Sequence, residues 1–414
     1  ELAEQQLEKS LAIDPKQAGV LQHWVHIRQK ACQWPVYKHL PRISKNQMLM
    51  CTSPLAMLAL HDDPGLQLLA AKNFVHRTYD FEEEFLSKDV NYQHEKTRIG
   101  YVSGDLCVHA VGLLLASVFE AHDKEKFDLY AYDFSPEDGS AQRERLKSSF
   151  VKCHDIRHMK DREVAEQILS DEIDILIDLH GLSSGARPEI FALHPAPTQG
   201  TYLGFIGTTG MTWFDFVLTD KYAMPDELVP YFTEQPVFLD QSFIPLVNNE
   251  SEIRHAVRSE FGLPEDAFVM AAFGNVYKIT PELFGSWVNI LKRVPDAILW
   301  LIDDNATTTR NLQAHAVSQG LDLARLKFTP RAAHAEFLAK IKLADVFLDT
   351  YPYNCGSTTN DVIQAGTPIV TLSGKTMVSR MGGSILTHLG MTSNITQNYS
   401  EYENKVVELA AHRF

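Results

Sequence analysis

The sequence predicts an α/β protein made of two parallel-sheet lobes behind a short helical segment. The chain has 414 residues, which is too long for a single hydrophobic core, so two or three domains are expected. From Arg98 onward, short apolar runs alternate with amphipathic helical stretches, a pattern typical of parallel strands joined by crossover helices. This alternation breaks around 248–252 and then restarts, which indicates a second unit of similar size.

Residues 1–45 are predicted to be helical. Ala3, Leu7 and Leu11 recur at helical spacing, and the first helix ends at Asp14 because proline follows and cannot continue the hydrogen-bond ladder. The pattern resembles the second helix of a tetratricopeptide repeat. A single repeat cannot bury its own apolar face, and the chain does not begin with Met, so further repeats are expected upstream. The alternative is a capping pair of helices that belongs to the main domain.

The rest of the chain is predicted to form a linker and two lobes. Residues 46–95 are expected to be a helical linker, strongly charged from Phe81 to Lys96. The first lobe is expected over 96–247, with strands at 98–103, 127–133, 173–178, 201–204, 214–219 and 237–239, and helices at 110–121, 141–150 and 161–170. The second lobe is expected over 254–414, with strands at 268–273, 298–302, 326–328, 346–348 and 368–372, and helices at 281–293, 308–318, 334–343 and 359–365.

Composition limits the classes of partner and compartment. The formal net charge is −15, whereas a nucleic-acid-binding surface needs a basic face, so no nucleic acid partner is expected. No apolar run approaches the roughly 20 residues that span a bilayer, so no membrane association is expected. The five cysteines are widely spaced and include no C-x-x-C pair, which favours a reducing compartment; we expect a cytoplasmic protein.

The strongest local signal lies in the second lobe, where the strand at 346–348 leads into Ser357-Thr358-Thr359 at the start of a helix. Small hydroxyl residues leave the free backbone amides of a helix start accessible, and with the helix dipole these amides suit a diphosphate. Asp361 is expected in the first turn of this helix, where a carboxylate can accept hydrogen bonds from ribose hydroxyls. The structural alternative is an ordinary helix cap made by hydroxyl residues.

Lys278 is the candidate cation of the same lobe. It follows the strand at 268–273 and precedes a helix, and a cation at that end of a strand can neutralise a departing diphosphate. The alternative is a solvated loop lysine. The nearby Ser373-Gly374-Lys375-Thr376 is similar to the end of a P-loop, but that motif requires glycine at position 369, which is Ile369. A P-loop is therefore excluded.

Two histidines of the first lobe are candidates for proton transfer or substrate orientation. His109 opens the helix that follows the strand at 98–103, with Asp105 between them, and histidine titrates near neutral pH. Asp178 and His180 end a second strand at the same edge of the sheet. A purely structural role is the alternative for either histidine. The remaining histidines show no metal-ligand spacing, so no metal site is predicted.

Six blocks in order along the chain resemble one family, the O-linked N-acetylglucosamine transferases, which include plant SPINDLY-type enzymes and bacterial tetratricopeptide-repeat members. The blocks are R-I-G-Y-V-S-G-D-L (98–106), D-L-H-G-L-S-S-G-A-R-P (178–188), Y-L-G-F-I-G-T-T-G (202–210), F-G-N-V-Y-K-I-T-P (273–281), W-V-N-I-L-K-R-V-P (287–295) and A-D-V-F-L-D-T-Y-P-Y-N (344–354). The resemblance covers essentially residues 1–400. It implies a GT-B fold of two Rossmann-like lobes, inverting transfer from a nucleotide sugar without a metal cofactor, and a protein acceptor.

The resemblance also implies roles for individual residues. His109 matches the active-site histidine of the family, and Lys278 matches the lysine on the donor diphosphate. The implied donor-binding positions are Asn275, the sugar-contacting turn Leu203 and Gly204, the uracil- and phosphate-flanking Pro330, Arg331 and His334, and Ser357, Thr358, Thr359 and Asp361. At Gly356 the chain departs from members that have a histidine near the nucleotide base, and its local sequence is more similar to the SPINDLY-like and bacterial branches.

The expected function is therefore inverting transfer of N-acetylglucosamine from UDP-N-acetylglucosamine to serine or threonine of intracellular proteins. Two alternatives stay open: the same fold with GDP-fucose or UDP-glucose as donor, and a catalytically inactive, repeat-bearing interaction protein. An epimerase or a phosphorylase of similar two-lobed build is a more distant alternative, and a phosphorylase would need a pyridoxal-bearing lysine that the sequence does not place.

Overall fold

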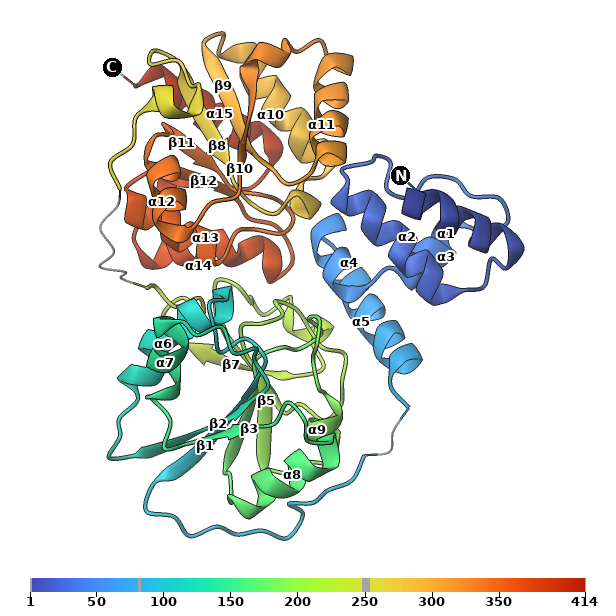
Figure 1. Cartoon of the computed structure of the whole chain (residues 1–414), viewed down its shortest axis with the longest axis vertical. Helices are drawn as coiled ribbons and strands as arrows, with labels where there is room; N and C mark the ends of the chain where they lie inside the picture. Colours follow the sequence, from blue (N-terminus) through green and yellow to red (C-terminus); the bar gives the residue numbers. More distant parts are fainter. Residues whose placement is uncertain (1, 81–82, 248–253, 414) are drawn as a thin grey trace. The chain divides into compact units, whose positions relative to one another are not determined.

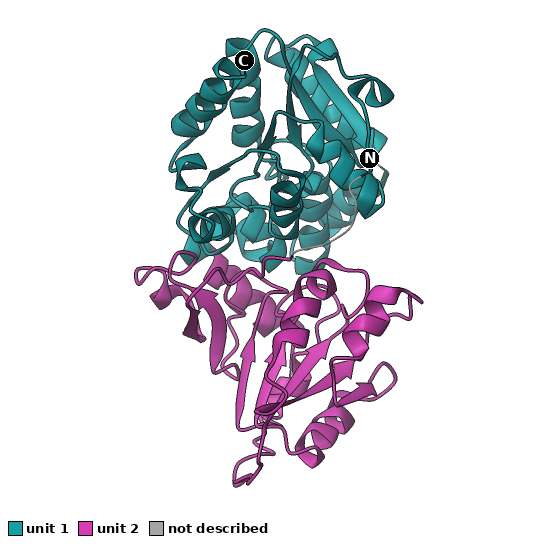
Figure 2. Cartoon of the chain, turned by 90° about the vertical axis from the view of Figure 1, so that its left-hand side faces the viewer, with its two compact units in different colours: residues 1–66, 248–414 teal, residues 67–247 magenta. Residues whose placement is uncertain are grey.

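The computed structural model describes residues 2–80, 83–247 and 254–413. The chain forms two compact units, shown in Figure 2: Gln67–Val247, and Glu1–Leu66 together with Asn248–Phe414. We call Gln67–Val247 the first lobe, residues 254–413 the second lobe, and residues 2–66, which share a unit with the second lobe, the helical segment. The pattern break expected at 248–252 lies outside the described residues.

The first lobe is built on a seven-stranded parallel sheet with the strand order β3-β2-β1-β4-β5-β6-β7. Figure 1 labels β1, β2, β3, β5 and β7 of this sheet. The strands are β1 (Thr97–Ser103), β2 (Phe127–Asp133), β3 (Lys152–Asp155), β4 (Ile175–Asp178), β5 (Thr198–Thr201), β6 (Phe216–Asp220) and β7 (Gln235–Leu239). The helices are α6 (Ala110–Ala121), α7 (Ala141–Lys147), α8 (Asp161–Ser170), α9 (Glu189–Ala192) and the 3-10 turn η1 (Val229–Tyr231).

The direction of the strand order reverses between β1 and β4. These two strands are neighbours in the sheet, with Val102 beside Asp178, although β2 and β3 come between them in the chain. Phe119 of α6 packs edge-on against Tyr101 of β1 with ring centroids 4.8 Å apart, which fixes the helix on the sheet. In doubly wound sheets, ligands bind outside the carboxyl ends of the strands at such a reversal. The segments after β1 and β4 are therefore where function is expected in this lobe.

The second lobe contains a six-stranded parallel sheet with the order β10-β9-β8-β11-β12-β13. The strands are β8 (Phe268–Ala272), β9 (Ala297–Asp303), β10 (Leu326–Pro330), β11 (Val346–Leu348), β12 (Ile369–Leu372) and β13 (Ile395–Thr396). The helices are α10 (Pro281–Arg293), α11 (Ala306–Ser318), α12 (His334–Lys342), α13 (Ser357–Ala365), α14 (Met381–His388) and α15 (Tyr399–Ala411), with 3-10 turns η2 (Arg258–Phe261), η3 (Val276–Lys278), η4 (Leu323–Arg325), η5 (Val378–Arg380) and η6 (Thr392–Asn394).

Both faces of this sheet are buried. Along β8, Met270 belongs to one hydrophobic cluster and Val269 and Ala271 to another, so alternate side chains enter separate cores on the two faces. Double burial explains why the strands read as continuous apolar runs rather than alternating ones. The strand order reverses between β8 and β11, where Ala271 lies beside Phe347. The second lobe thus has the same reversal of strand order as the first, and we call each reversal the switch point of its lobe.

The helical segment comprises α1 (Leu2–Ile13), α2 (Ala18–Lys30), α3 (Lys45–Cys51) and α4 (Pro54–Leu60), and α5 (Pro64–Thr78) begins at its end. Its core includes Leu11 and Trp24, both fully buried. It is bonded to the second lobe: Gln29 donates to the Tyr277 carbonyl at 3.1 Å, and Asn311 donates to the Ala31 carbonyl at 2.9 Å. This attachment favours the capping pair over a detached repeat remnant.

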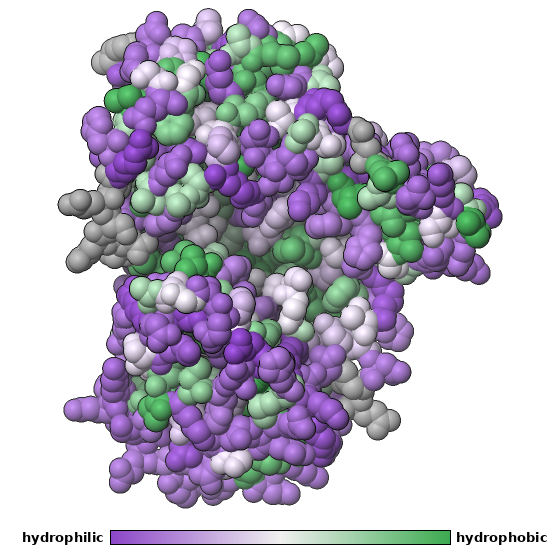
Figure 3. All heavy atoms as spheres, viewed as in Figure 1, coloured by the Kyte–Doolittle hydropathy of each residue, from purple (hydrophilic) through white to green (hydrophobic). Residues whose placement is uncertain are grey.

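The outer surface of the helical segment carries exposed apolar side chains. Leu2, Ile13 and Met50 are all exposed, and hydrophobic patches on these helices are visible in Figure 3. Within the described part of the chain, none of the helices combines the length and apolar character needed to cross a bilayer.

The two parallel-sheet lobes are confirmed, and β2, β11, α6, α8 and α10 have the predicted bounds. The strand predicted at 201–204 was wrong, because β5 is Thr198–Thr201 and the following residues form a turn. Residues 46–95 are not a single linker: α3 and α4 lie in the helical segment, and the unit boundary falls at 66–67 within α5. The sequence patterns missed β3, β13, α9, α14 and α15.

Candidate active site

Lys278 lies at the switch point of the second lobe, at the end of the turn η3 that follows β8. Its Nζ donates to the Asn354 carbonyl at 3.0 Å and lies 3.8 Å from the ring centroid of Tyr353, a cation–π contact. The residue is 8% exposed, so it is not the solvated loop lysine of the alternative interpretation. Burial lowers the pKa of Lys278, and the nearby Cys355 and Asp349 oppose that shift.

The loop between β11 and α13, residues 349–356, is held rigidly by two buried side chains. Asp349 accepts hydrogen bonds from the backbone N–H groups of Thr350 (2.8 Å) and Cys355 (2.7 Å), and burial raises its pKa to about 6. Asn354 donates to the carbonyls of Thr350 at 2.8 Å and Leu372 at 3.3 Å. The Asn354 carbonyl is therefore fixed in place where the Lys278 ammonium meets it.

Helix α13 begins at Ser357, and its N-cap residue, Gly356, makes no side-chain cap hydrogen bond. The first N–H groups of a helix have no intrahelical acceptor, so an uncapped start presents donors to an anion. Ser357 and Thr358 at these positions are partly exposed. Thr359 differs from the prediction: its amide donates to the Gly356 carbonyl at 3.0 Å and its hydroxyl to the Cys355 carbonyl at 2.7 Å, so both of its donors are used inside the protein.

Asp361 and His334 form a pair beside this helix start. The His334 Nε2 and Asp361 Oδ1 atoms are 2.7 Å apart. This hydrogen bond raises the pKa of His334 above its ordinary value, because the carboxylate stabilises the imidazolium. Asp361 is the fifth residue of α13, so its predicted place in the first turn was wrong by one position.

The remaining donor-site candidates of this lobe are engaged with one another. Arg331 donates to Asn275 Oδ1 at 2.9 Å and forms an ion pair with Asp304 at 2.8 Å, so its charge is already paired. Pro330 ends β10, and its carbonyl accepts a hydrogen bond from Lys340 Nζ at 2.9 Å. These contacts order the strand end and do not by themselves identify a ligand group.

In the first lobe, His109 is the N-cap residue of α6. Its Nδ1 accepts a hydrogen bond from the Val111 N–H at 3.4 Å and lies 3.4 Å from the Asp105 carboxylate. The His109 side chain is 49% exposed, so its Nε2 edge is open to a substrate. The geometry allows both of the predicted functions, orientation and proton acceptance.

His180 and Asp178 are built into the loop after β4. The His180 Nε2 accepts from the Gly104 N–H at 2.8 Å, so a neutral ring carries its hydrogen on Nδ1, which is 2.9 Å from the Ser183 hydroxyl. Burial lowers the pKa of His180, which favours that neutral form. Asp178 accepts from the N–H groups of His180 at 3.0 Å and Gly181 at 2.6 Å, and burial raises its pKa to about 7. This bonding favours the structural alternative for both residues.

Leu203 and Gly204 form a tight turn directly after β5. The Gly204 N–H donates to the Tyr202 carbonyl at 2.8 Å across Leu203, which has a φ of 69°. A positive φ is strained for a leucine and is often found at functional sites. A Cβ atom on Gly204 would lie 1.8 Å from the Leu179 carbonyl oxygen, so only glycine fits there. The turn is therefore specified by the close approach of two strand ends.

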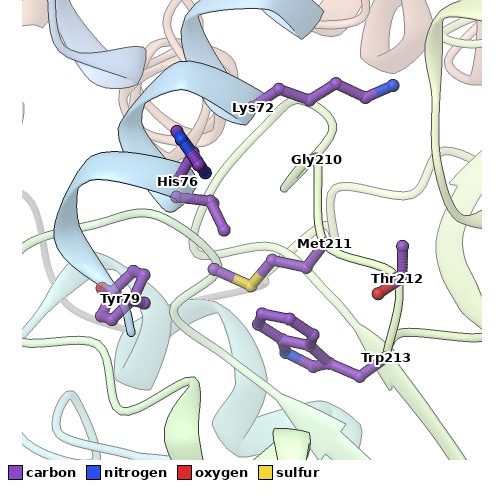
Figure 4. A pocket seen from close by; sticks show the side chains of 8 residues that line it. Lys72, His76, Tyr79, Gly210, Met211, Thr212 and Trp213 are labelled. Atoms are coloured by element: carbon purple, nitrogen blue, oxygen red, sulfur yellow. The ribbon is translucent and has the colours of Figure 1, made fainter. Parts of the chain in front are cut away.

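A cavity of about 300 Å³ also lies in the first lobe, between α5 and the segment after β5 (Figure 4). Lys72, His76, Met211 and Trp213 are among the residues that line it. None of the sequence-predicted site residues lines this cavity.

Sequence reasoning missed Asp349 and Asn354, which organise the loop between β11 and α13. Their signal was present, because buried polar residues directly after a parallel strand need partners and commonly shape the loop there. It also missed Asp62, which is bonded to the Ser373-Gly374-Lys375-Thr376 loop that was excluded as a P-loop. No sequence pattern links Asp62 to residues more than 300 positions away. Among the described residues, no group of three or more His, Cys, Asp or Glu side chains could hold a metal ion.

Comparison with known proteins places these residues in a family. The model of glycosyl transferase family 41 matches residues 65–248 and 247–413. An Arabidopsis thaliana protein named "Probable UDP-N-acetylglucosamine–peptide N-acetylglucosaminyltransferase SEC" is 37% identical over 328 residues, covering 77% of this chain and 33% of its own length. A Caenorhabditis elegans UDP-N-acetylglucosamine–peptide N-acetylglucosaminyltransferase is 26% identical over 428 residues, covering 76% of this chain and 37% of its own. The chain thus spans about a third of the length of these relatives.

The fold agrees with these matches. A solved structure of a Thermobaculum terrenum O-GlcNAc transferase variant superposes with a TM-score of 0.82 at 27% identity, covering 99% of this chain and 79% of that one. The two Rossmann-like lobes are therefore those of the GT-B class of glycosyltransferases. With both lobes matched by the family model and the sequence blocks in order, the chain belongs to glycosyl transferase family 41, which confirms its resemblance to the O-linked N-acetylglucosamine transferases.

Proposed function

We propose that this chain is an inverting glycosyltransferase that moves N-acetylglucosamine from UDP-N-acetylglucosamine to serine or threonine side chains of proteins. One observation carries the proposal: the buried Lys278 ammonium lies 3.0 Å from the Asn354 carbonyl, in the loop that leads into α13, whose N-cap residue Gly356 offers no side chain to the amides of Ser357 and Thr358. An ammonium group and helix-start amides together suit a leaving diphosphate. The names of the relatives support the choice of sugar and of a peptide acceptor.

The proposed reaction is a direct displacement. The acceptor hydroxyl oxygen forms a bond to the anomeric carbon while the bond from that carbon to the β-phosphate oxygen breaks, and UDP leaves with the electron pair. Lys278 and the amides of Ser357 and Thr358 stabilise the charge on the diphosphate. The hydroxyl proton passes to a base, for which His109 and a diphosphate oxygen are the two candidates. His109 in either case orients a reacting group through its exposed ring edge.

The other predicted residues take supporting roles in this proposal. Asp361, paired with His334, accepts hydrogen bonds from the ribose hydroxyls, and protonated His334 offsets the negative charge of Asp361 near the nucleotide. The turn at Leu203 and Gly204 contacts the sugar. We propose that no metal is required, because the ammonium and the helix dipole already supply positive charge at the leaving group. Unchanged transfer in the presence of EDTA is the expected result.

We also propose a cytoplasmic location and no nucleic acid or membrane partner. The five cysteines are free thiols, four of them buried, which suits a reducing compartment. The net charge of −15 disfavours polyanionic partners. Cell fractionation with an antibody to the chain tests the location, and recovery in a membrane or secreted fraction would overturn it.

The direct test is donor binding and transfer by the unmodified protein. Isothermal titration with UDP and with GDP is expected to show binding of UDP alone, and incubation with UDP-N-acetylglucosamine and a cell lysate is expected to add N-acetylhexosamine to proteins detected by mass spectrometry. Binding of GDP but not UDP would move the assignment to a guanine-nucleotide donor. Flat titrations with both nucleotides would favour the catalytically inactive interaction protein.

Lys278→Met removes the ammonium group and keeps a side chain of similar length. Loss of one preorganised contact to the transition state costs about 3 kcal/mol, so transfer is expected to fall by roughly 10²-fold or more in single-turnover assays. Burial lowers the pKa of Lys278, so the folded protein binds the lysine proton more weakly than the unfolded chain does. The free energy of unfolding therefore rises with pH between the folded pKa and 10.5. At neutral pH the variant should therefore keep or raise Tm. A folded variant with normal transfer rates would refute the role of Lys278.

A further inference from the structure

Asp62 lies in the short connection between α4 and α5, and its carboxylate accepts hydrogen bonds from five donor groups of the second lobe. The donors are the Tyr351 hydroxyl (2.8 Å), the Lys375 N–H (2.8 Å), the Thr376 N–H (3.1 Å), the Thr376 hydroxyl (2.9 Å) and the Ser379 hydroxyl (2.7 Å). All of these contacts are within one compact unit of the chain. Such a set of donors converging on one carboxylate is a specific anchoring point.

The loop that receives this carboxylate is Ser373-Gly374-Lys375-Thr376, which resembles the end of a P-loop but binds an anion of its own chain. A Cβ atom on Gly374 would lie 2.3 Å from Asp62 Oδ2, so the carboxylate approaches the backbone where only glycine fits. The Gly374 carbonyl in turn accepts from Arg380 Nη1 at 2.9 Å, which orders the turn η5 behind it. The chemistry of this motif is therefore used to hold Asp62.

Asp62 connects this loop to the loop on which the leaving diphosphate is proposed to sit. Tyr351 belongs to residues 349–356, which lead directly into α13. The two loops also meet at Asn354, whose N–H donates to the Val378 carbonyl at 3.3 Å and whose Oδ1 accepts from the Gly382 N–H at 3.3 Å. Asn354 is the residue whose carbonyl accepts the Lys278 hydrogen bond. A displacement of Asp62 would thus be transmitted to the Lys278 contact through a single loop.

The helical segment also contacts the turn that carries Lys278. Gln29 donates to the Tyr277 carbonyl at 3.1 Å, and the Cys32 thiol donates to the Val276 carbonyl at 3.4 Å. Both acceptors lie in η3, immediately before the Lys278 side chain. The helical segment therefore touches both structures that define the spacing between the ammonium group and the start of α13.

We infer that Asp62 is a positioning residue for the nucleotide-sugar site: its carboxylate fixes loop 349–356 against loop 373–379, and so sets the place of the helix-start amides relative to Lys278. It does not contact the donor and acts through Tyr351 and the loop backbone. This inference rests on the proposed binding of a nucleotide diphosphate at α13. It gives the helical segment a part in donor binding in addition to its place in the fold.

The test compares Asp62→Asn with Asp63→Asn in the full chain. In Asp62→Asn an NH2 group, which donates hydrogen bonds, replaces a carboxylate oxygen that accepts them from backbone N–H groups, so these bonds are lost. The Kd for UDP and the KM for the nucleotide sugar are expected to rise about tenfold, with kcat changed by less than about twofold. Asp63 is the matched control, because it lies in the same connection, has the same charge and takes no part in the second-lobe contacts given above; in the described structure its carboxylate accepts a hydrogen bond from the Leu66 N–H, at 3.0 Å. Asp63→Asn should leave both constants unchanged.

Tyr351→Phe provides a milder variant in case Asp62→Asn does not fold. It removes one hydroxyl donor and is expected to raise the UDP Kd several-fold, and the double variant should bind no more weakly than Asp62→Asn alone, because the two side chains share one interaction. A purely structural role would lower Tm and the active fraction while KM and Kd stay at their wild-type values. That result, or equal effects at Asp62 and Asp63, would overturn the inference.

The two proposals fail in different ways. If the wild-type protein binds neither UDP nor GDP, the proposed function fails. If the wild-type protein binds UDP, and folded Asp62→Asn and Tyr351→Phe bind it equally well, only the role of Asp62 fails.

Discussion

The two lobes place their candidate functional residues at the same topological position, but the helix start at that position is capped by a side chain in the first lobe and is not in the second. In both, the leading candidates lie at the ends of the two strands at which the strand order reverses: His109 and His180 after β1 and β4 in the first lobe, and Lys278 and Ser357 after β8 and β11 in the second. In the first lobe the helix after β1 is capped by His109 itself, and the loop after β4 is closed by Asp178 and His180. In the second lobe the N-cap residue of α13 is Gly356, which has no side chain to cap the helix.

This difference decides the chemistry that each switch point can perform. A side-chain cap satisfies one donor of the helix start, and the His109 imidazole that makes this cap can also orient a group or accept a proton. An uncapped start beside a buried ammonium keeps its donors for an anion. In the proposed function, the same fold position thus serves as a proton-handling site or a diphosphate site according to the residue at the N-cap. Substitutions at the N-cap residues are accordingly the most direct test of this difference between the lobes.

Gly356→Asp should have the largest effect. A Cβ atom at this position would meet only Met381 Sδ, at 3.8 Å, so the side chain has room and can cap α13. The new carboxylate would occupy the anion position, and since like charges brought together cost several kcal/mol, UDP affinity is expected to fall by about 10³-fold in isothermal titration. Tm should stay the same or rise slightly, because aspartate caps a helix better than glycine by a few tenths of a kcal/mol.

Gly356→Ala is the control for this prediction. It adds the Cβ atom without an acceptor or a charge, and UDP affinity should remain within a few-fold of the wild-type value. If alanine weakens binding as much as aspartate does, the position is limited by space rather than by capping, and the contrast between the two lobes loses its basis.

His109→Ala should have the next largest effect, and on a different constant. Loss of a positioned acid–base or orienting group is expected to lower kcat by about 10²-fold, whereas the Kd for UDP should not change, since the diphosphate receptor belongs to the second lobe. His109→Asn separates the two roles of the residue, because asparagine is a good N-cap but not a proton acceptor. A normal kcat in the asparagine variant would show that His109 is only a helix cap.

The His334–Asp361 pair should give the smallest effect, visible as a pH dependence. The hydrogen bond to Asp361 raises the pKa of His334, so the pair contributes stability below the ordinary histidine pKa of 6.5 and loses it as the pH rises through the folded value. The same rise in pH removes a positive charge near the nucleotide. UDP affinity should therefore fall on the alkaline side, by up to about fivefold for one partly exposed charge. In His334→Gln this fall in UDP affinity with pH should be absent from isothermal titrations at successive pH values. If the fall persists, another group causes it.

Much of the fold and part of the site could be predicted from local patterns. The central strands of both lobes are largely buried apolar runs, and Lys278 follows β8, His109 precedes the helix after β1 and Ser357 begins the helix after β11, so their place at a sheet edge follows from chain order. The roles of Thr359 and His180 could not be predicted, because their hydrogen bonds depend on loop backbone that approaches them only in the folded chain. The turn at Leu203 was mistaken for strand because its residues are apolar, whereas the close approach of Gly204 to Leu179 specifies it.

The sequence by itself determined the two parallel sheets, the order of their elements and the kinds of residue at the ends of their strands, since these follow from the periodicity of burial and from the steric limits of proline and glycine. Only the tertiary structure decided which of those residues remain available. Whether a donor or a charge is free depends on what lies within about 3 Å of it, and for Asp62, Arg331 and the Nε2 atom of His180 such neighbours come from segments 27 or more residues away in the chain. Hydrogen bonding acts at short range in space, without regard to distance along the sequence.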